Sequence, residues 1–270
     1  MPELPEVETT RRGISPAILN KKINDVIIRR ANLRYPIPKI IHEKLIAKSF
    51  SEITRRSKYL IFQSEHGSMI LHLGMSGNLR IVPKLTAPQK HDHVDFIFDD
   101  CCLRYTDPRR FGAILWTEKN PEQHKLLISL GPEPLTAKFN GAHLFKIAQR
   151  HSLTVKNFIM DSKNVVGVGN IYASEALFLS KIHPHQAANK ITLEQYNLLA
   201  KMIKTTLKKA IKAGGTTLKD FYQFDGKPGY FKNELQVYGR AGEKCYDCNG
   251  LIKKIITGQR ATYFCEECQD

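Results

Sequence analysis

The first half of the chain is built of short runs in which apolar and polar residues alternate. Alternation with period two is typical of strands that bury one face, and turn-forming residues separate these runs. One longer segment near the start, residues 5–19, has the spacing of an amphipathic helix instead. The predicted strands cover residues 23–29, 44–55, 59–64, 68–73, 78–82, 92–98, 102–107 and 113–117. Strands this short and this regularly spaced favour a β-sandwich or a barrel.

After residue 140 the period changes, because apolar residues recur every three or four positions. This pattern predicts helices over residues 141–151, 154–160, 171–180 and 192–213. Between the two patterns, residues 131–140 hold Gly131, Pro132 and Pro134, a composition typical of a linker. The chain is therefore predicted to be a two-domain α+β protein, and its 270 residues are enough for two cores.

Four cysteines near the end of the chain are spaced as metal ligands. Cys245 and Cys248 are separated by two residues, as are Cys265 and Cys268, and sixteen residues lie between the pairs. This spacing is typical of an all-cysteine zinc site, in which four thiolates leave no position open for a substrate, so the zinc is expected to be structural. Two disulfides are the alternative interpretation. Zinc is favoured because the sequence shows no apolar signal segment and no run long enough to span a bilayer.

The charge balance indicates a polyanionic partner. The chain has 41 Lys and Arg against 26 Asp and Glu, a formal net charge of +15, and its basic residues recur inside Gly-rich and aromatic segments. One such segment is the Gly-rich turn at residues 165–169, which would present free backbone N–H groups to a phosphate. A tight turn between two helices, with Asn170 as a cap, explains the same residues equally well.

Pro2 stands directly behind the initiator methionine. Removal of Met1 would leave Pro2 with a secondary amine, and because α-amino groups titrate near ~8, a usable fraction would be nucleophilic at neutral pH. The simpler interpretation is that Pro2 and Pro5 open a helix, with the acids that follow complementing its positive end. The residues alone leave both interpretations open.

The motifs along the whole chain resemble those of the bacterial formamidopyrimidine-DNA glycosylases. The related endonuclease VIII group generally opens Pro-Glu-Gly-Pro, so Leu4 favours the formamidopyrimidine branch. The matching stretches are residues 1–9, 55–60 (Arg-Arg-Ser-Lys-Tyr-Leu), 72–77 (His-Leu-Gly-Met-Ser-Gly), 90–95, 105–112, 165–175, 214–221, 225–231 and 259–262.

The resemblance implies a catalytic role for four residues. The Pro2 amine would attack C1′ of a damaged deoxynucleotide, expel the base and form a Schiff base, after which β- and δ-elimination cut the strand. Glu3 resembles the acid that protonates the opening sugar, Lys58 a proton donor, and Arg260 the finger arginine of the δ-elimination step. Without the family, Glu3 is a complement to the helix dipole and Lys58 an ordinary charge at a strand end.

The resemblance also implies how DNA is held. A lesion inside a duplex must be turned out, and Met75, Arg109 and Phe111 resemble the side chains that fill the gap. Residues 214–221 and 226–230 resemble a lid over the base pocket. Relatives often have a lysine-rich stretch where this chain has Arg150 and His151. The further predicted DNA contacts are His91, Arg110, Arg150, His151, Lys156 and Asn170.

The family's organisation gives the expected domains and partners. Residues 1–130 would form a catalytic domain like a β-sandwich with flanking helices, and 131–140 a linker. Residues 141–235 would form a helix-two-turn-helix domain with the lesion loop, and 236–270 a four-cysteine zinc-finger β-hairpin. The expected protein is a cytoplasmic, nucleoid-associated monomer with one structural Zn²⁺, which acts on double-stranded DNA containing oxidised purines or abasic sites and has no membrane partner.

Two other classes of protein are compatible with parts of the sequence. A zinc-ribbon DNA-binding protein without chemistry explains the charge and the cysteines, but it leaves Pro2, Glu3 and Lys58 without a purpose. A zinc hydrolase needs an open metal site such as a His-Glu-x-x-His run. The sequence has no such run, and its nearest histidine pair is His91 and His93.

Overall fold

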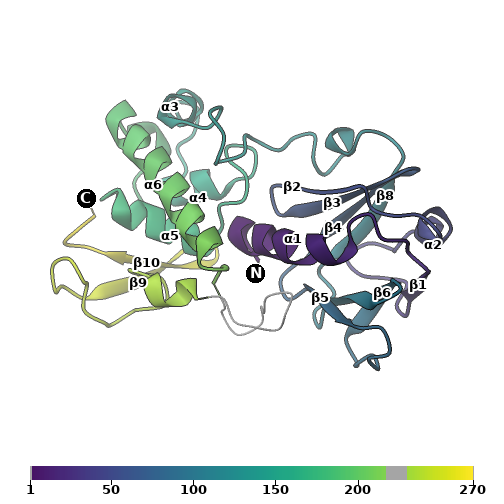
Figure 1. Ribbon diagram of the computed structural model, residues 1–270. Helices are drawn as coiled ribbons and strands as arrows, with labels where there is room; N and C mark the ends of the chain where they lie inside the picture. Colours follow the sequence, from purple (N-terminus) through teal and green to yellow (C-terminus); the bar gives the residue numbers. More distant parts are fainter. Residues whose placement is uncertain (1, 217–229, 270) are drawn as a thin grey trace. The chain divides into compact units, whose positions relative to one another are not determined.

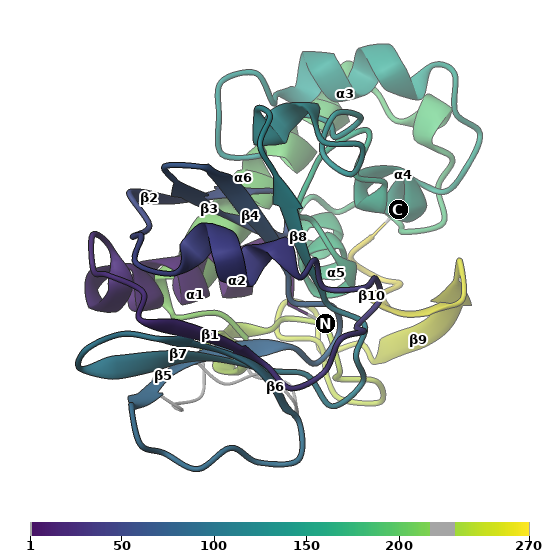
Figure 2. The same cartoon turned by 90° about the vertical axis from the view of Figure 1, so that its right-hand side faces the viewer.

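The computed structural model describes residues 2–216 and 230–269 and divides into two compact units. The sheet unit comprises Met1–Ile128 and Ala213–Tyr230, and the helical unit comprises Ser129–Lys212 and Phe231–Asp270. The chain therefore passes between the units three times, at 128/129, 212/213 and 230/231. Figure 1 labels helices and strands of both units, and Figure 2 adds the label of β7.

Two four-stranded antiparallel sheets form the sheet unit. The order in the first sheet is β1 (Asp25–Ile28), β6 (Asp92–Ile97), β7 (Cys101–Thr106) and β5 (Asn78–Pro83). The order in the second sheet is β2 (Glu52–Arg56), β3 (Tyr59–Ser64), β4 (Gly67–His72) and β8 (Ala113–Thr117). The predicted sandwich is confirmed, and β3 and β8 have the predicted bounds.

The core of the sheet unit is apolar and draws on both sheets and on α1 (Leu4–Ile18). Three buried rings meet in it: the ring centroids of Phe50 and Phe62 are 5.1 Å apart, and those of Phe50 and Phe96 are 6.2 Å apart. α1 contacts strands of both sheets and buries Ile14 completely. Figure 2 shows α1 and α2 alongside the space between the two sheets. This packing fixes where the first turn of α1 lies.

One strand prediction is wrong in its first half. Residues 44–55 were expected to be a strand, but α2 (Ile40–Leu45) covers the start of this segment and β2 begins only later. Ile41 and Leu45 of α2 are both buried and stand four residues apart, which places them on one face of the helix. The short helix forms because it buries both side chains in the core of the sheet unit.

Four α-helices and a hairpin make up the described part of the helical unit. α5 (Asn170–Leu179) lies at its centre, because it contacts α4, α6 and β10 and is buried from residue 171 to 178. Its neighbours are α3 (Gly141–Ala148), α4 (Val155–Met160), α6 (Leu193–Lys212), β9 (Ile252–Thr257) and β10 (Arg260–Cys265). Short 3-10 helices lie at Ala188–Lys190 and Phe231–Glu234 in this unit, and another lies at Pro121–Gln123 in the sheet unit. Within residues 2–216 and 230–269, no helix is both long and apolar enough to cross a membrane.

The segment predicted as a linker, residues 131–140, belongs to the helical unit. The backbone N–H of Gly131 donates to the carbonyl oxygen of Ser162 at 2.8 Å, and the carbonyl of Pro132 accepts from the N–H of Val166 at 3.2 Å. These bonds attach the start of the segment to the turn between α4 and α5.

Candidate functional site

The first turn of α1 carries the predicted nucleophile and acid. Pro2 is buried, and Glu3, only 3% exposed, is the N-cap residue with an extended backbone. The N–H of Glu3 donates to Oε2 of Glu6 at 2.8 Å, so a carboxylate satisfies one of the free amides at the helix start. Pro2 and Glu3 therefore lie at the positive end of the helix.

Glu6 also holds this turn against a segment 210 residues further along the chain. Its Oε1 accepts a hydrogen bond from the N–H of Thr216 at 2.8 Å. Gly215 approaches closely with a φ of +83°, and a Cβ there would lie 3.1 Å from the same oxygen. Sequence reasoning did not single out Glu6. The signal that could have found it is the spacing Glu3-x-x-Glu6, a variant of the capping box.

Lys58 lies in the turn between β2 and β3, and Arg55 fixes that turn. The Arg55 guanidinium donates to the carbonyl oxygen of Ser57 at 2.8 Å and to Oε2 of Glu8 at 3.3 Å, which joins the turn to α1. Burial alone would raise the pKa of Glu8, but hydrogen bonds from two other arginines of α1 and the charge of Arg55 lower it to about 2. Glu8 is therefore an anion at neutral pH, and its bond to Arg55 helps to position the turn that contains the half-buried Lys58.

His72, at the end of β4, is a neutral group next to this turn. Burial, followed by the positive charges of Lys58 and Arg34, lowers the pKa of His72 to about 4. Its Nδ1 accepts a hydrogen bond from the N–H of Gly74 at 3.0 Å, so Nε2 carries the ring proton. His72 thereby fixes the start of the loop that carries Met75.

The three predicted gap-filling residues project from two loops of the sheet unit. Met75 is 37% exposed and Phe111 is 47% exposed, although both are apolar. The guanidinium of Arg109 stacks on the ring of Phe111, 4.9 Å from its centroid. Arg110, also exposed, has a φ of +59°. The loops thus present one flexible apolar side chain, one aromatic ring and two cations.

The backbones of these two loops pack directly on each other. A Cβ on Gly74, whose φ is +71°, would lie 2.4 Å from the backbone nitrogen of Gly112. A Cβ on Gly112 would lie 1.8 Å from the hydroxyl of Tyr105. No side chain fits at either position, so the two glycines allow Met75 and Phe111 to share one surface.

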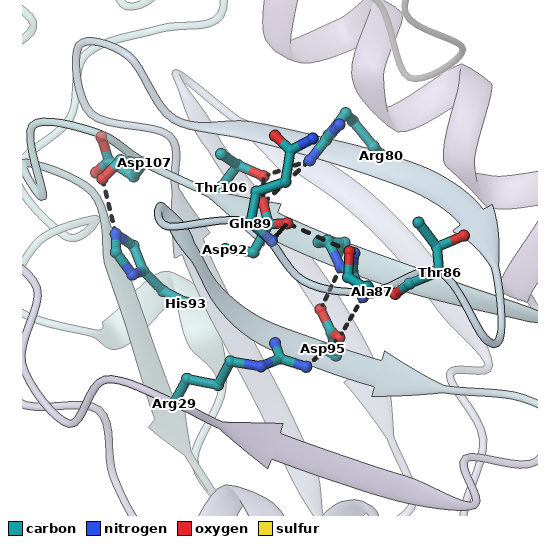
Figure 3. A network of polar contacts seen from close by, with 11 residues as sticks. Arg29, Arg80, Thr86, Ala87, Gln89, Asp92, His93, Asp95, Thr106 and Asp107 are labelled. Atoms are coloured by element: carbon teal, nitrogen blue, oxygen red, sulfur yellow. Dashed lines mark hydrogen bonds and ion pairs between the residues drawn. The ribbon is translucent and has the colours of Figure 1, made fainter.

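An ion-pair network on β6 and β7 holds the loop that precedes His91 (Figure 3). Arg104, which is buried, donates to both carboxylate oxygens of Asp95 at 2.9 and 2.8 Å. The same guanidinium donates to the carbonyl oxygens of two loop residues, Ala87 at 3.0 Å and Thr86 at 2.8 Å. The network fixes the backbone on one side of His91, which is half-buried.

In the helical unit, Lys156 is completely buried. Its ammonium donates to Oδ1 of Asn170 and Oγ1 of Thr262, both at 2.6 Å, and to the carbonyl oxygen of Ala261 at 3.3 Å. The side-chain N–H of Asn170 donates to the same carbonyl at 2.9 Å. These bonds join α4, the start of α5 and β10. The DNA contacts of Lys156 and Asn170 stay predictions.

Arg260 begins β10 and is exposed. It pairs with Thr257 across a two-residue turn, Gly258 and Gln259, in which both φ angles are positive, as in a tight hairpin turn. A Cβ on Gly258 would lie 2.8 Å from Oδ1 of Asn157, so the turn rests against α4. The hairpin therefore presents Arg260 from a firmly held strand end.

Arg150 and His151 follow α3. Arg150 is exposed, whereas the ring of His151 packs 5.4 Å from the ring of Phe158. Within the Gly-rich turn, residues 165–169 are buried, and the amides of Val165 and Val166 already donate to backbone carbonyls. Those two bonds support the interpretation of this segment as a tight turn, but the predicted cap is wrong, because the N-cap residue of α5 is Gly169 and not Asn170. The DNA contacts of Arg150 and His151 stay predictions.

The four cysteines predicted to bind metal lie together in the helical unit. The sulfur atoms of Cys245, Cys248, Cys265 and Cys268 all lie within 4.8 Å of one another, and those of Cys248 and Cys265 are 3.4 Å apart. Four sulfurs bound at about 2.3 Å to one tetrahedral zinc ion would be roughly 3.8 Å apart, so the cluster has suitable dimensions. All four are free thiols, and two of them pack into an apolar cluster with α5 and β9.

Comparison with known proteins identifies the family. Residues 1–114 match the model of the formamidopyrimidine-DNA glycosylase N-terminal domain, and residues 130–222 match that of the formamidopyrimidine-DNA glycosylase H2TH domain. The chain belongs to the formamidopyrimidine-DNA glycosylase family.

Similarity to relatives that carry the family's name extends over the whole chain. The formamidopyrimidine-DNA glycosylases of Psychromonas ingrahamii and Methylococcus capsulatus are each 53% identical to it, with 100% of both chains covered. Among solved structures, a variant of the Lactococcus lactis FPG protein in complex with DNA containing Fapy-dG superposes with a TM-score of 0.93 at 35% identity, again over 100% of both chains.

Sequence reasoning gave no role to Glu175 of this family member. This residue of α5 is buried, and its carboxylate accepts the N–H groups of Gln236, Val237 and Tyr238 at 2.8 to 3.0 Å. Burial raises the pKa of Glu175, although these bonds oppose the shift. The residue ties the chain that enters the four-cysteine hairpin to the central helix. Only its place in the family motif at residues 165–175 could have indicated it.

The predicted site residues of this glycosylase-family chain are shared between the two units. The sheet unit holds Pro2, Glu3, Lys58, Met75, His91, Arg109, Arg110 and Phe111, and the helical unit holds Arg150, His151, Lys156, Asn170, Arg260 and the four cysteines. Of the predicted lid at residues 214–221 and 226–230, residues 217–221 and 226–229 lie outside the described residues.

Proposed function

We propose that this chain is a bifunctional DNA glycosylase and AP lyase that removes 8-oxoguanine and formamidopyrimidines from double-stranded DNA. The nucleophile is the amine of Pro2, exposed by removal of Met1. The observation that carries the proposal is the pair Pro2 and Glu3, both buried at the positive end of a 15-residue helix that is anchored in the core of the sheet unit.

The chemistry follows from one bond between protein and sugar. The Pro2 nitrogen bonds to C1′ while the bond from C1′ to the base breaks, and the base leaves with the bonding electrons and takes up a proton. Glu3 gives a proton to the ring oxygen as the sugar opens, which leaves an iminium ion between Pro2 and C1′. The iminium acidifies the hydrogen on C2′. Its loss expels the 3′ phosphate, a second elimination expels the 5′ phosphate, and water then frees the amine.

Lys58 and Arg260 complete the proposed catalytic set. Lys58 acts as a proton donor, and its position is supported by the bonds from Arg55 to Ser57 in the same turn and to Glu8 of α1. Arg260 binds a backbone phosphate during δ-elimination, a role supported by its exposure at the tip of a rigid hairpin.

The substrate class is supported by the exposed loop residues and by the relatives. Met75, Arg109 and Phe111 are suited to fill the gap left when a damaged nucleotide is turned out of the duplex. The solved Lactococcus lactis structures are of complexes with DNA that contains Fapy-dG or an abasic site, at 35–36% identity over nearly the whole chain. A net charge of +15 suits a phosphate backbone, so binding is expected to weaken steeply with salt.

The four cysteines would hold one structural Zn²⁺. A Cys₄ set suits zinc because thiolates are its preferred structural ligands, and four of them leave no open position for substrate or water. The bound ion would supply folding energy to the β9–β10 hairpin and hence hold Arg260.

Borohydride trapping tests the mechanism. The processed protein, a version that retains Met1, and Pro2→Gly are incubated with a duplex containing 8-oxoguanine opposite cytosine, and the reduced adduct is mapped by mass spectrometry. We expect a covalent adduct on Pro2 that disappears when Met1 is retained. Tight, salt-sensitive duplex binding with verified Met1 removal but no adduct would refute the lyase proposal and favour a zinc-containing DNA-binding protein without chemistry.

A further inference from the structure

Asp107, at the end of β7, is a buried carboxylate with four neutral donors. It is 0% exposed. Its Oδ1 accepts from the hydroxyl of Ser76 at 2.8 Å and from the N–H of Arg109 at 3.3 Å. Its Oδ2 accepts from the N–H of Gly112 at 2.9 Å and from the hydroxyl of Tyr105 at 3.1 Å. Burial, followed by the neighbouring Asp107, raises the pKa of Tyr105, so the phenol stays a donor.

The backbone of the same residue holds a third loop. The N–H of Asp107 donates to the carbonyl oxygen of His91 at 3.1 Å. Its own carbonyl oxygen lies 2.8 Å from Nε2 of His93, a contact drawn in Figure 3, and also accepts from the N–H of Arg110 at 3.2 Å. One residue therefore bonds to the loop before β6, the loop after β4 and the loop after β7.

The bonded groups stand next to the predicted gap-filling side chains. Ser76 follows Met75 in the chain, and Gly112 follows Phe111. The third bonded group is the backbone N–H of Arg109, which is itself one of the predicted gap-filling residues. A local turn that begins at an aspartate would need only the bond to the amide two residues later. The bonds to Ser76, 31 residues away, and to Gly112 go beyond such a turn.

We propose that Asp107 is the positioning residue that locks the Met75 loop and the Arg109–Phe111 loop into a single wedge, so that all three side chains enter the duplex together. This inference rests on the proposed function and adds to it. The contacts that the inserted side chains make must offset the free-energy cost of unstacking the bases. A loop that changes conformation instead of keeping its side chains inserted would not hold the nucleotide outside the duplex. Because both loops bond to the same carboxylate, neither can move without the other.

Three substitutions separate the parts of this arrangement. Asp107→Asn keeps the size of the side chain but has a single acceptor oxygen, so the amide of Gly112 or the Ser76 and Arg109 pair loses its partner and one loop is released. Ser76→Ala releases the Met75 loop from the carboxylate; it also removes the hydroxyl that accepts from the N–H of Arg109 at 3.3 Å, but that amide keeps its bond to Oδ1 of Asp107. Tyr105→Phe is the matched control, because it removes one hydrogen bond to the same carboxylate without releasing either loop.

The test uses the full-length, zinc-loaded, processed protein and two substrates. Single-turnover excision of 8-oxoguanine from a duplex requires extrusion of the nucleotide, whereas cleavage at an abasic site in single-stranded DNA does not. Loss of one buried hydrogen bond to a charged group predicts a decrease of about 10- to 100-fold in the duplex rate for Asp107→Asn. We expect the single-stranded rate to stay within about twofold. Ser76→Ala should give a smaller decrease of the same kind, and Tyr105→Phe should give none.

A binding measurement distinguishes a failure of this inference from a failure of the proposed catalytic mechanism. With a duplex that carries a stable abasic analogue beside 2-aminopurine, insertion of the wedge changes the fluorescence even if Pro2 forms no adduct. Asp107→Asn should reduce that change while Tyr105→Phe keeps it. Equal losses on both substrates, a normal fluorescence change in Asp107→Asn, or an unaltered duplex rate would each overturn the inference. If borohydride trapping fails but the fluorescence change is reduced in Asp107→Asn and kept in Tyr105→Phe, only the proposed mechanism is refuted.

Discussion

Glu6→Gln tests whether one carboxylate holds the first turn of α1 to the segment that ends at Thr216. In the native protein Oε2 accepts from the N–H of Glu3 and Oε1 from the N–H of Thr216, both at 2.8 Å. A glutamine has one oxygen, so one of these donors must face an NH₂ group. The short bond to Glu3 is part of the helix start, and we therefore expect the amide of Thr216 to be the one released.

The structure sets the size of the effect. A buried amide left without its acceptor costs about 1–3 kcal/mol, and because Glu6 is 2% exposed, water does not replace the carboxylate. This free energy corresponds to faster amide exchange at Thr216 by a factor of about 5 to 150. Hydrogen exchange measured by mass spectrometry on fragments covering residues 213–216 reports it directly.

Glu43→Gln provides the control, because Glu43 is an exposed glutamate of α2 in the same unit. It makes the same change of charge and should leave the exchange at Thr216 unaltered. Gly215→Ala should accelerate the exchange as Glu6→Gln does, because the added Cβ would lie 3.1 Å from Oε1 in a strained φ of +83°. An exchange rate in Glu6→Gln within twofold of the parent would refute the anchoring role of the carboxylate.

Three further predictions concern stability. Lys156→Met should lower the free energy of unfolding by about 2 kcal/mol in urea titrations, because the oxygens around the ammonium lose their charged donor. Chelation of the metal, or Cys265→Ser, should unfold the β9–β10 hairpin and release one zinc per chain in a colorimetric assay, while β-sheet circular dichroism persists. Since the pKa of His72 is lowered from 6.5 to about 4, its contribution is complete above pH 6.5 and is lost as the pH falls toward 4, by up to about 3 kcal/mol in denaturant titrations. Glu8, with a pKa lowered to about 2, should add a second loss only between pH 4.5 and 2.

The sequence predicts those parts of the fold that depend on near neighbours in the chain. Strands β3 and β8 have the predicted bounds, although β3 buries three consecutive residues, Leu60 to Phe62, and does not alternate. The cysteine cluster follows from two short spacings. The exposure of Phe111 is consistent with its place in a turn between Pro108 and Gly112. α2 has only six residues, fewer than two helical turns, so its apolar positions do not distinguish helix spacing from alternation.

The parts that the sequence could not predict are buried charges with distant partners. Glu6 meets Thr216 across 210 residues, and Asp107 meets Ser76 across 31. Arg104 reaches back 18 residues to the carbonyl of Thr86. No pattern within one element marks these residues, because their positions would suit an ordinary surface charge. Each becomes recognisable only when the sheets bring its donors and acceptors together.

Because the chain returns to the sheet unit only at residue 213, the start of α1 is completed late in synthesis. During synthesis, the helix that begins beside Pro2 leaves the ribosome first, but the carboxylate of Glu6 gains its second partner only when Thr216 has been added. By then all four α-helices of the helical unit have been translated. A nascent chain that stops before residue 213 thus has a complete helix start in sequence but lacks the bond that closes it. The first turn of α1 is therefore completed only after residues 213–216 have been synthesised.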